Sequence, residues 1–246
     1  MVAVRYWLVM PAAGASRRFG TAQSKLERSL AGRTVLDLAL EPFMDDERCR
    51  GIALALNPDG LANAEVRARL GRKVLPIAGG ERRCDSVLAG LAALSMAEAD
   101  DWVLVHDAAR PCLSAADLAA LLAAGAQHAV GALLAEPVAD TLKRADGASA
   151  IDATVDRRGL WRALTPQMFR YGALRAALQA AVAAGREPTD EAQCMEWQGA
   201  RPLLVAGEDA NIKITSPKDL ELAAAILATR AAAASPGEGM GARSCA

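Results

Sequence analysis

The sequence predicts an α/β fold in which a mainly parallel sheet is covered on both faces by helices. Short apolar runs bounded by Gly, Pro, Asn or charged residues are typical of buried strands, and the stretches between them carry helix start signals. The apolar runs occupy residues 5–10, 51–56, 73–77, 102–106 and 129–135. Regular alternation of strands with helices favours a parallel sheet, because each crossover places a helix against one face.

Helix starts in the first half of the chain are marked by the pattern Ser/Thr-x-x-Asp/Glu, in which a side chain caps the first turn. The pattern occurs at residues 34–37, 95–98 and 114–117. The second copy lies near the end of a helical stretch, and we interpret it as accidental. The other two copies predict that a helix begins directly after each of them.

The second half of the chain continues with helices and two more strands. Helical character returns at 168–184 and again after Thr189, and strands are expected at 201–207 and 211–214. The sequence "SPKD" then supplies an N-cap, a proline at the first helical position and an acidic third residue. It predicts a last helix near 217–233.

Residues 136–165 interrupt the alternation of strands and helices. They alternate polar and apolar residues around the weak turn "ADGAS", which predicts a β-hairpin arm that leaves the sheet. An isolated hairpin is marginally stable in water, so we expect its outer face to meet a second copy of the chain in a homodimer. We expect a single domain over residues 1–230. Residues 231–246 lose all periodicity and predict a disordered tail.

The bulk composition excludes several classes of protein. The formal net charge is −1, so no global basic field indicates a nucleic-acid partner. The five cysteines are odd in number and form no CxxC pair, which argues against a disulfide framework or a zinc site and fits a reducing compartment. No uninterrupted apolar run reaches the roughly 18 residues that span a bilayer, and no signal peptide is recognised. We therefore expect a cytoplasmic protein that does not bind membranes.

The loop after the first strand, "PAAGASRRFGTAQSK", favours an anionic ligand. Small residues that let a ligand approach the backbone N–H groups are Ala12, Ala13 and Gly14. Cations that could converge on a polyphosphate are Arg17, Arg18 and Lys25. The loop lacks the Lys-Ser/Thr ending of a Walker A loop and the first Gly-x-Gly of a dinucleotide fingerprint. A solvated surface loop is the alternative, but a position at the carboxyl end of a strand favours binding.

Two further strand ends carry candidate residues. The strand at 102–106 leads directly into Asp107, whose carboxylate would suit Mg²⁺. Asp107 could instead cap a helix or pair with Arg110, and the preceding histidine is more often structural than a general base. In the stretch 79–91, Gly80 and Ser86 could read the edge of a base through hydrogen bonds, or could simply form a tight turn and a cap.

Six stretches in a fixed order carry a family resemblance: "PAAGASRRFG…SK", "GGERRCDSVLAGL", "VHDAARP", "TVDRRGLWRALTPQ", "TDEA" and "NIKIT". Over residues 5–228 the chain resembles the 2-C-methyl-D-erythritol 4-phosphate cytidylyltransferases of the non-mevalonate isoprenoid pathway. PAAGxxxR loops occur across nucleotidyltransferases, whereas "HDAARP" together with "TVDR…LTPQ" is highly specific. The resemblance implies a Rossmann-like nucleotidyltransferase domain with a dimerisation arm.

The resemblance also implies roles for individual residues. Arg18 and Lys25 would stabilise charge on the nucleotide phosphates. The implied nucleotide-binding residues are Ala12, Ala13, Gly14, Gly80, Glu81 and Ser86. Asp107 would help to hold Mg²⁺ or the substrate polyol, with Arg110 beside it. The implied pocket for methylerythritol phosphate contains Thr141, Arg157, Thr165 and Lys213, of which the first two would reach from the arm into the neighbouring subunit. One departure from the family is Ser24-Lys25-Leu26-Glu27, where relatives commonly have a proline before the lysine.

The implied reaction is attack by the phosphate of methylerythritol phosphate on the α-phosphorus of CTP, with loss of pyrophosphate. A phosphate monoester has a second pKa near 6, so it is a competent nucleophile without a general base. The difficulty is repulsion between two polyanions, and cations are the parts required. The predicted catalytic cations are Arg18, Lys25, Arg157 and Lys213, assisted by Mg²⁺. A cytidylyltransferase for another polyol phosphate, such as ribitol 5-phosphate, and a non-catalytic CTP sensor are the alternatives.

Overall fold

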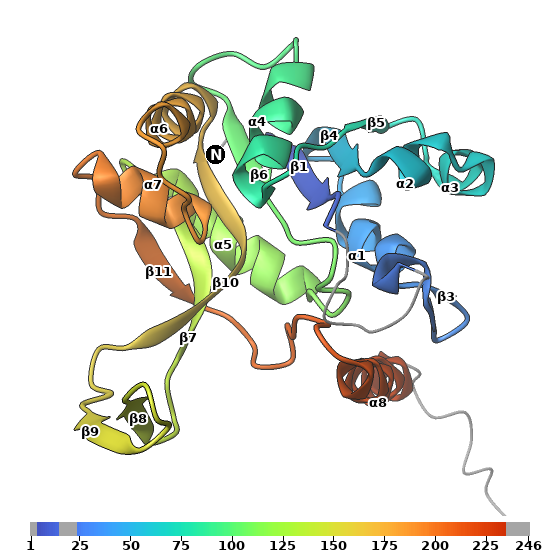
Figure 1. The fold of residues 1–246 in the computed structure, drawn as a ribbon. Helices are drawn as coiled ribbons and strands as arrows, with labels where there is room; N and C mark the ends of the chain where they lie inside the picture. The colour runs from blue at the N-terminus through green and yellow to red at the C-terminus, as the bar shows by residue number, and fades with distance from the viewer. Residues whose placement is uncertain (1–3, 15–23, 235–246) are drawn as a thin grey trace, which may run out of the picture.

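A computed structural model describes residues 4–14 and 24–234 of the chain. Its main sheet has the strand order β11-β7-β10-β6-β1-β4-β5 (Figure 1). The strands are β1 (Tyr6–Ala12), β4 (Cys49–Leu56), β5 (Val74–Ala78), β6 (Trp102–Val105), β7 (Gly131–Pro137), β10 (Trp161–Arg170) and β11 (Leu203–Ala206). Strand β10 runs antiparallel to β6 and β7, and the other neighbouring pairs are parallel. The prediction of a mostly parallel sheet is confirmed.

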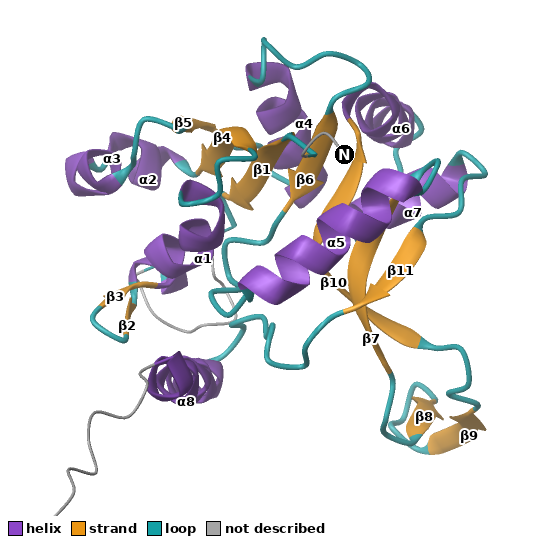
Figure 2. Cartoon of the chain, turned by 180° about the vertical axis from the view of Figure 1, so that it is seen from behind, coloured by secondary structure: helices purple, strands orange, loops and turns teal. Residues whose placement is uncertain are grey.

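Helices cover both faces of this sheet, as Figures 1 and 2 show from opposite sides. One hydrophobic cluster joins the sheet to α1 (Val35–Met44), α5 (Ala115–Gln127) and α8 (Pro217–Ala234). The other joins it to α4 (Arg83–Ala93), α6 (Tyr171–Ala183) and α7 (Glu191–Trp197). Alternate residues of β1 belong to different clusters. The apolar run is continuous because side chains on both faces of this strand are buried.

The short elements lie beside this core. They are the 3₁₀ helix η2 (Lys25–Glu27), the strands β2 (Ser29–Leu30) and β3 (Arg33–Thr34), and the helices α2 (Pro58–Ala62) and α3 (Ala64–Arg69). Within the described residues, no helix combines the length and the apolar character that crossing a bilayer requires.

The predicted helix starts are confirmed. The Thr34 hydroxyl accepts a hydrogen bond from the Asp37 amide at 3.1 Å, and the Asp37 carboxylate accepts one from the Thr34 amide, which completes a capping box at α1. Ser114 caps α5 through the Asp117 amide at 3.0 Å. The second copy of the pattern, at residues 95–98, follows the end of α4 and begins no helix, so its interpretation as accidental is confirmed.

Three local predictions of secondary structure are wrong. Residues 168–170 belong to β10 rather than to a helix, because pairing with both β6 and β7 keeps them extended. Residues 211–214 form no strand, and their backbone groups bind loops instead: the Ile214 amide donates to the Ala109 carbonyl at 2.8 Å. Helix α8 continues to Ala234, so the tail prediction is wrong for 231–234, and its remainder lies outside the described residues.

The predicted hairpin arm is present and projects from the body of the protein (Figure 1). Strands β8 (Leu142–Ala145) and β9 (Ile151–Val155) pair antiparallel in a separate small sheet. Most of their side chains are exposed, including Ile151 at 68 %. The dimer inferred from this arm and the single-domain boundaries stay predictions.

Candidate active site

A cavity of about 260 Å³ lies at the carboxyl ends of β1, β5 and β6. Strands β4 and β5 lie on one side of β1, and β6 lies on the other. The crossovers therefore diverge at β1, which is where open α/β sheets bind ligands. The predicted site residues that line the cavity are Ala12, Ala13, Gly14, Lys25, Gly80, Glu81, Ser86, Asp107 and Lys213. Residues from five separate stretches of the sequence are thus brought together.

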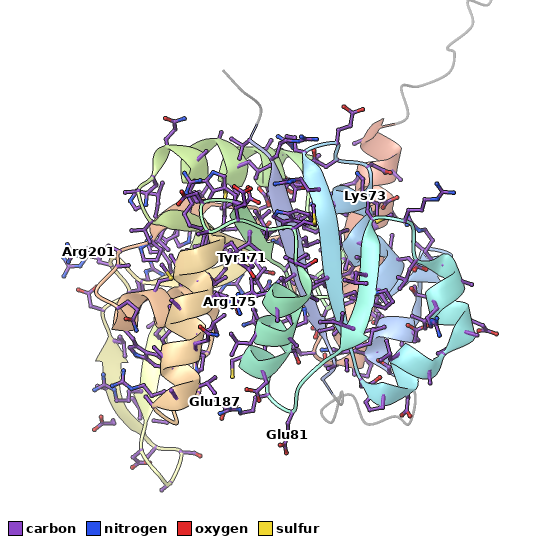
Figure 3. All side chains as sticks on the ribbon, turned by 90° about the horizontal axis from the view of Figure 1, so that it is seen from above. Lys73, Glu81, Tyr171, Arg175, Glu187 and Arg201 are labelled. Atoms are coloured by element: carbon purple, nitrogen blue, oxygen red, sulfur yellow. The ribbon has the colours of Figure 1, made fainter. Side chains whose placement is uncertain are left out.

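The loops after β1 and β5 approach each other so closely beside the cavity that only small residues fit between them. A Cβ on Gly79 would lie 2.4 Å from the Ala13 Cβ, so the loops after β1 and β5 touch each other directly. The Ser86 hydroxyl accepts a hydrogen bond from the Gly80 amide at 3.1 Å. The turn foreseen as the alternative interpretation is therefore real, and it also lines the cavity. Glu81 is exposed at the rim, and Figure 3 shows its side chain pointing outward from the loop between β5 and α4.

Asp107 lies at the centre of a cluster of cations. Its Oδ1 accepts a hydrogen bond from Arg83 Nε at 3.1 Å, and its Oδ2 lies 2.7 Å from Lys213 Nζ and 3.8 Å from Arg110 Nε. Burial alone would raise the pKa of Asp107, but Arg83, Lys213 and Arg110 hold it well below its ordinary value. The pairing with Arg110 was foreseen as an alternative, whereas the contact with Arg83 was not predicted.

Lys25 is held at the cavity by a short ordered turn. Ser24 caps η2, because its hydroxyl accepts a hydrogen bond from the Leu26 amide at 3.3 Å. The Leu26 side chain is buried beneath this turn. The Lys25 ammonium donates a hydrogen bond to the Ile214 carbonyl at 2.7 Å. Ile214 directly follows Lys213 in the sequence. The departure from the common family pattern at 24–27 therefore supplies a cap and a buried anchor for the loop lysine.

A buried hydrogen-bonded layer supports Asp107 from behind. The Thr165 hydroxyl accepts a hydrogen bond from the Asp107 amide at 3.1 Å and lies 2.9 Å from His106 Nδ1. His106 Nε2 lies 3.1 Å from the Arg110 carbonyl, which can only accept. The imidazole therefore carries its proton on Nε2 and accepts from Thr165 through Nδ1. These contacts support the structural interpretation of His106.

Two predicted substrate-binding residues belong to this buried layer rather than to the cavity wall. Arg110 and Thr165 are 8 % and 4 % exposed, and the Arg110 guanidinium donates to the Asn211 carbonyl at 2.6 Å. Thr141 and Arg157 lie on the exposed arm and do not line the cavity within this chain. Arg17 and Arg18 lie outside the described residues. The roles assigned to all six residues stay predictions.

We expect the free energy of unfolding to fall as the pH is lowered from about 6.5 to about 4. Burial lowers the pKa of His106 to about 4, so in this window the unfolded chain takes up a proton that the folded chain does not. The loss should approach about 3 kcal/mol. Urea unfolding at a series of pH values checks it. His128→Gln should keep this slope and His106→Gln should reduce it; equal slopes in the two variants would contradict the assignment.

Comparison with known proteins assigns the family. The family model described as "IspD: 2-C-methyl-D-erythritol 4-phosphate cytidylyltransferase" matches residues 6–229. The chain belongs to this cytidylyltransferase family. The resemblance predicted over residues 5–228 is therefore confirmed.

Individual family members agree over almost their whole length. The chain is 52 % identical to 2-C-methyl-D-erythritol 4-phosphate cytidylyltransferase of Acidithiobacillus ferrooxidans, with 92 % of this chain and 98 % of the relative covered. It is 50 % identical to that of Halorhodospira halophila, with 93 % and 96 % covered. The crystal structure of the cytidylyltransferase of Francisella tularensis matches with a TM-score of 0.78 at 31 % identity, covering 90 % of this chain and 99 % of that one.

Sequence reasoning missed Arg83 and Glu191. Both occur in the quoted stretches "GGERRCDSVLAGL" and "TDEA", but neither received a role. They are 108 residues apart and meet only in the folded chain, where the Arg83 guanidinium pairs with the Glu191 carboxylate. A basic residue at one helix start and an acidic residue at another were the available signals, and these alone do not indicate a pair.

Proposed function

We propose that this chain transfers the cytidylyl group of CTP to 2-C-methyl-D-erythritol 4-phosphate. The products are 4-diphosphocytidyl-2-C-methyl-D-erythritol and pyrophosphate, in the non-mevalonate isoprenoid pathway. The observation that carries the proposal is the cavity at the carboxyl end of β1 in a member of this family, which is lined by Lys25 together with Arg83 and Lys213, the last two paired with Asp107. Such a cavity suits two phosphorylated substrates.

The bond changes follow from the chemistry of phosphate esters. An oxygen of the methylerythritol phosphate attacks the α-phosphorus of CTP and forms the new P–O bond. The bond from the α-phosphorus to the bridging oxygen breaks, and pyrophosphate leaves with the electron pair. The nucleophile is already ionised at neutral pH, so no side chain has to remove a proton. The protein supplies orientation and positive charge instead.

The two lysines divide between the substrates in this proposal. The ammonium of Lys25 faces the triphosphate beside the loop formed by Ala12, Ala13 and Gly14, with Arg18 as its predicted companion. Lys213, oriented by Asp107 at 2.7 Å, serves the incoming phosphate. The backbone around Gly80 and the Ser86 turn face the base. Because the carbonyl of Ile214 holds Lys25, both lysines are tied to the same segment of chain.

We propose that Mg²⁺ enters as part of the nucleotide substrate, held mainly by phosphate oxygens, as this ion commonly is. Within the described residues, no group of three or more His, Cys, Asp or Glu side chains is arranged to bind a metal. Both carboxylate oxygens of Asp107 already face cations, at 3.1 Å from Arg83 and 2.7 Å from Lys213. This environment does not fit an ion held chiefly by the protein, and the metal-binding role of Asp107 stays a prediction.

We also propose that the active enzyme is a homodimer in which the arm of one copy completes the site of the other. Thr141 and Arg157 lie on the projecting arm, away from the cavity of their own chain. Ile151 and Trp161 leave apolar surface exposed along the arm. A two-stranded hairpin gains stability by packing against further structure.

A cytoplasmic location accords with the free thiols at Cys49, Cys84, Cys112 and Cys194.

We expect Arg157→Ala to raise the KM for methylerythritol phosphate at least about tenfold and to change the KM for CTP by less than about twofold. A guanidinium that binds two phosphate oxygens contributes roughly that much binding free energy. Steady-state kinetics with each substrate varied in turn checks it. Comparable increases in both KM values would contradict the placement of Arg157 in the alcohol-phosphate pocket.

Mixing two variants tests whether the arm acts across subunits. Arg157→Ala and Lys25→Ala, exchanged by mild dissociation and reassembly, would form heterodimers with one intact site, composed of Lys25 from one copy and Arg157 from the other. At concentrations of methylerythritol phosphate well below the KM of the Arg157→Ala variant, activity should then exceed that of either variant alone. No recovery, although subunits have exchanged, would show that each chain uses its own arm.

A coupled pyrophosphate assay tests the function itself. CTP, ATP, GTP and UTP are each supplied with 2-C-methyl-D-erythritol 4-phosphate, and CTP is also supplied with ribitol 5-phosphate. We expect rapid release of pyrophosphate only with the pair CTP and methylerythritol phosphate. A greater kcat/KM with ribitol 5-phosphate would assign a different polyol phosphate, and tight CTP binding without pyrophosphate release would indicate a nucleotide sensor.

A further inference from the structure

Glu191 is a fully buried carboxylate that does not line the cavity. It is the first residue of α7, and its exposed fraction is 0 %. A buried carboxylate destabilises the fold unless it is paired. The Arg83 guanidinium provides the pairing, because its Nη1 donates to Oε1 at 2.6 Å and its Nη2 donates to Oε2 at 2.9 Å. Glu191 therefore does not reach the substrates itself, but it holds Arg83, which lines the cavity.

The grip on Arg83 determines where Asp107 lies. A guanidinium is planar and rigid, so fixing Nη1 and Nη2 on Glu191 also fixes the direction of the Nε–H bond. That bond points at Asp107 Oδ1, at 3.1 Å. The other carboxylate oxygen, Oδ2, is left for Lys213 Nζ at 2.7 Å. Through Arg83 and Asp107, the buried Glu191 at the start of α7 therefore fixes the position of the Lys213 ammonium at the cavity.

The start of α7 is itself tied to the strand that supports Asp107. Gln167 of β10 accepts a hydrogen bond from the Ala192 amide at 2.8 Å and donates to the Asp190 carboxylate at 3.0 Å. Thr165, on the same strand, accepts a hydrogen bond from the Asp107 amide. Glu191 and Asp107 are therefore anchored to one strand by separate contacts, which fixes the spacing that Arg83 bridges.

The charges of this cluster suit an anionic ligand. Arg83, Arg110 and Lys213 surround Asp107, and Arg83 also pairs with Glu191, so that three cations face two carboxylates. Of these three cations, Arg83 and Lys213 line the cavity. Burial raises the pKa of Glu191. Without Glu191, the freed guanidinium could fork across both oxygens of Asp107 and compete with Lys213 for Oδ2.

We propose that Glu191 is a positioning residue for the incoming phosphate. It orients Arg83, and through Arg83 it orients Asp107 and Lys213, without touching either substrate. The inference rests on the proposed function, in which Lys213 serves the phosphate of the alcohol substrate.

Glu191→Gln tests the inference, with Glu196→Gln on the exposed side of the same helix as the matched control. The KM for methylerythritol phosphate should rise about tenfold while the KM for CTP changes less than about twofold. The control should match the parent chain. In an Arg83→Gln background, Glu191→Gln should add less than about twofold, because the residue acts through Arg83. If Glu191 only stabilised the fold, its replacement would reduce the fraction of folded, active enzyme. The apparent kcat would then fall, and both KM values would stay unchanged.

Three results would overturn the inference: unchanged KM values in Glu191→Gln, equal increases for both substrates, or a full additional loss in the Arg83→Gln background. If Glu191→Gln does not fold, Glu191→Asp carries the test. It keeps the charge but shortens the reach, and it should raise the same KM at least about threefold; an unchanged KM would overturn the inference. Pyrophosphate release by the parent chain separates the two proposals. A parent chain that releases no pyrophosphate would contradict the proposed function. An active parent chain whose Glu191→Gln variant has unchanged KM values would contradict only the proposed role of Glu191.

Discussion

Lys25→Ala should lower kcat about a hundredfold or more, as removal of one charge-stabilising donor commonly does. The reaction gathers negative charge on the oxygens that bridge the phosphates, and the Lys25 ammonium lies at the cavity where those oxygens would be bound. Its hydrogen bond to the Ile214 carbonyl, at 2.7 Å, holds it there before substrate arrives. A stopped-time pyrophosphate assay at saturating substrates gives kcat directly.

Lys218→Ala is the matched control for this variant. Lys218 is an exposed lysine on the first turn of α8, close in sequence to Lys213 but outside the cavity wall. It should retain the parent kcat, and both variants should melt at the parent temperature. A Lys25→Ala chain that turns over as fast as the parent would end the view that gathered cations drive the reaction.

Asp107→Asn should lower the free energy of unfolding by about 3 kcal/mol, the lower part of the range for removing one partner of a buried ion pair. Arg83 would keep its pairing with Glu191, but Lys213 and Arg110 would lose the carboxylate with which they pair, and repulsion among the three cations would no longer be compensated. The lower part of the range applies because Lys213 is 39 % exposed and stays partly hydrated. Urea unfolding at pH 7 measures the change.

Asp156→Asn is the control for this stability prediction. Asp156 pairs with Arg158 on the exposed arm, where solvent screens the charges, and its loss should leave the unfolding midpoint unchanged. Equal midpoints for Asp107→Asn and the parent chain would show that the cation cluster needs no central carboxylate. Activity should be lost as well, because Lys213 would lose the anion that orients it.

Much of the fold could be predicted because its signals are local. Most side chains of β1 (Tyr6–Ala12) are buried, on both faces of the sheet, and the Thr34 capping box forms as the pattern indicates. Lys25 was predicted from its loop after the first strand, whereas Lys213 came from the family resemblance, since no periodicity places a lysine at residue 25 beside one at residue 213. Their hydrogen bonds to Ile214 and Asp107 appear only when the ends of several strands meet.

The errors arose where tertiary contacts override local pattern. Residues 168–170 lead directly into α6, but pairing on both sides of β10 keeps them extended. The apolar alternation at 211–214 is typical of a strand, yet Arg110 and Ala109 take up its backbone groups. The pair of Arg83 with Glu191 depends on which helix starts face each other, a property of the assembled sheet.

The pairing of β7 with β10 ends at Pro137 and Trp161, and the β8–β9 hairpin lies beyond that end. Because this ladder closes the base of the segment, changes in residues 138–160 other than the predicted substrate-binding residues Thr141 and Arg157 should leave the body of the protein undisturbed. In the proposed homodimer, such changes would alter the contact between the two copies. In that proposed homodimer, two versions of the protein with divergent arms would not form mixed assemblies.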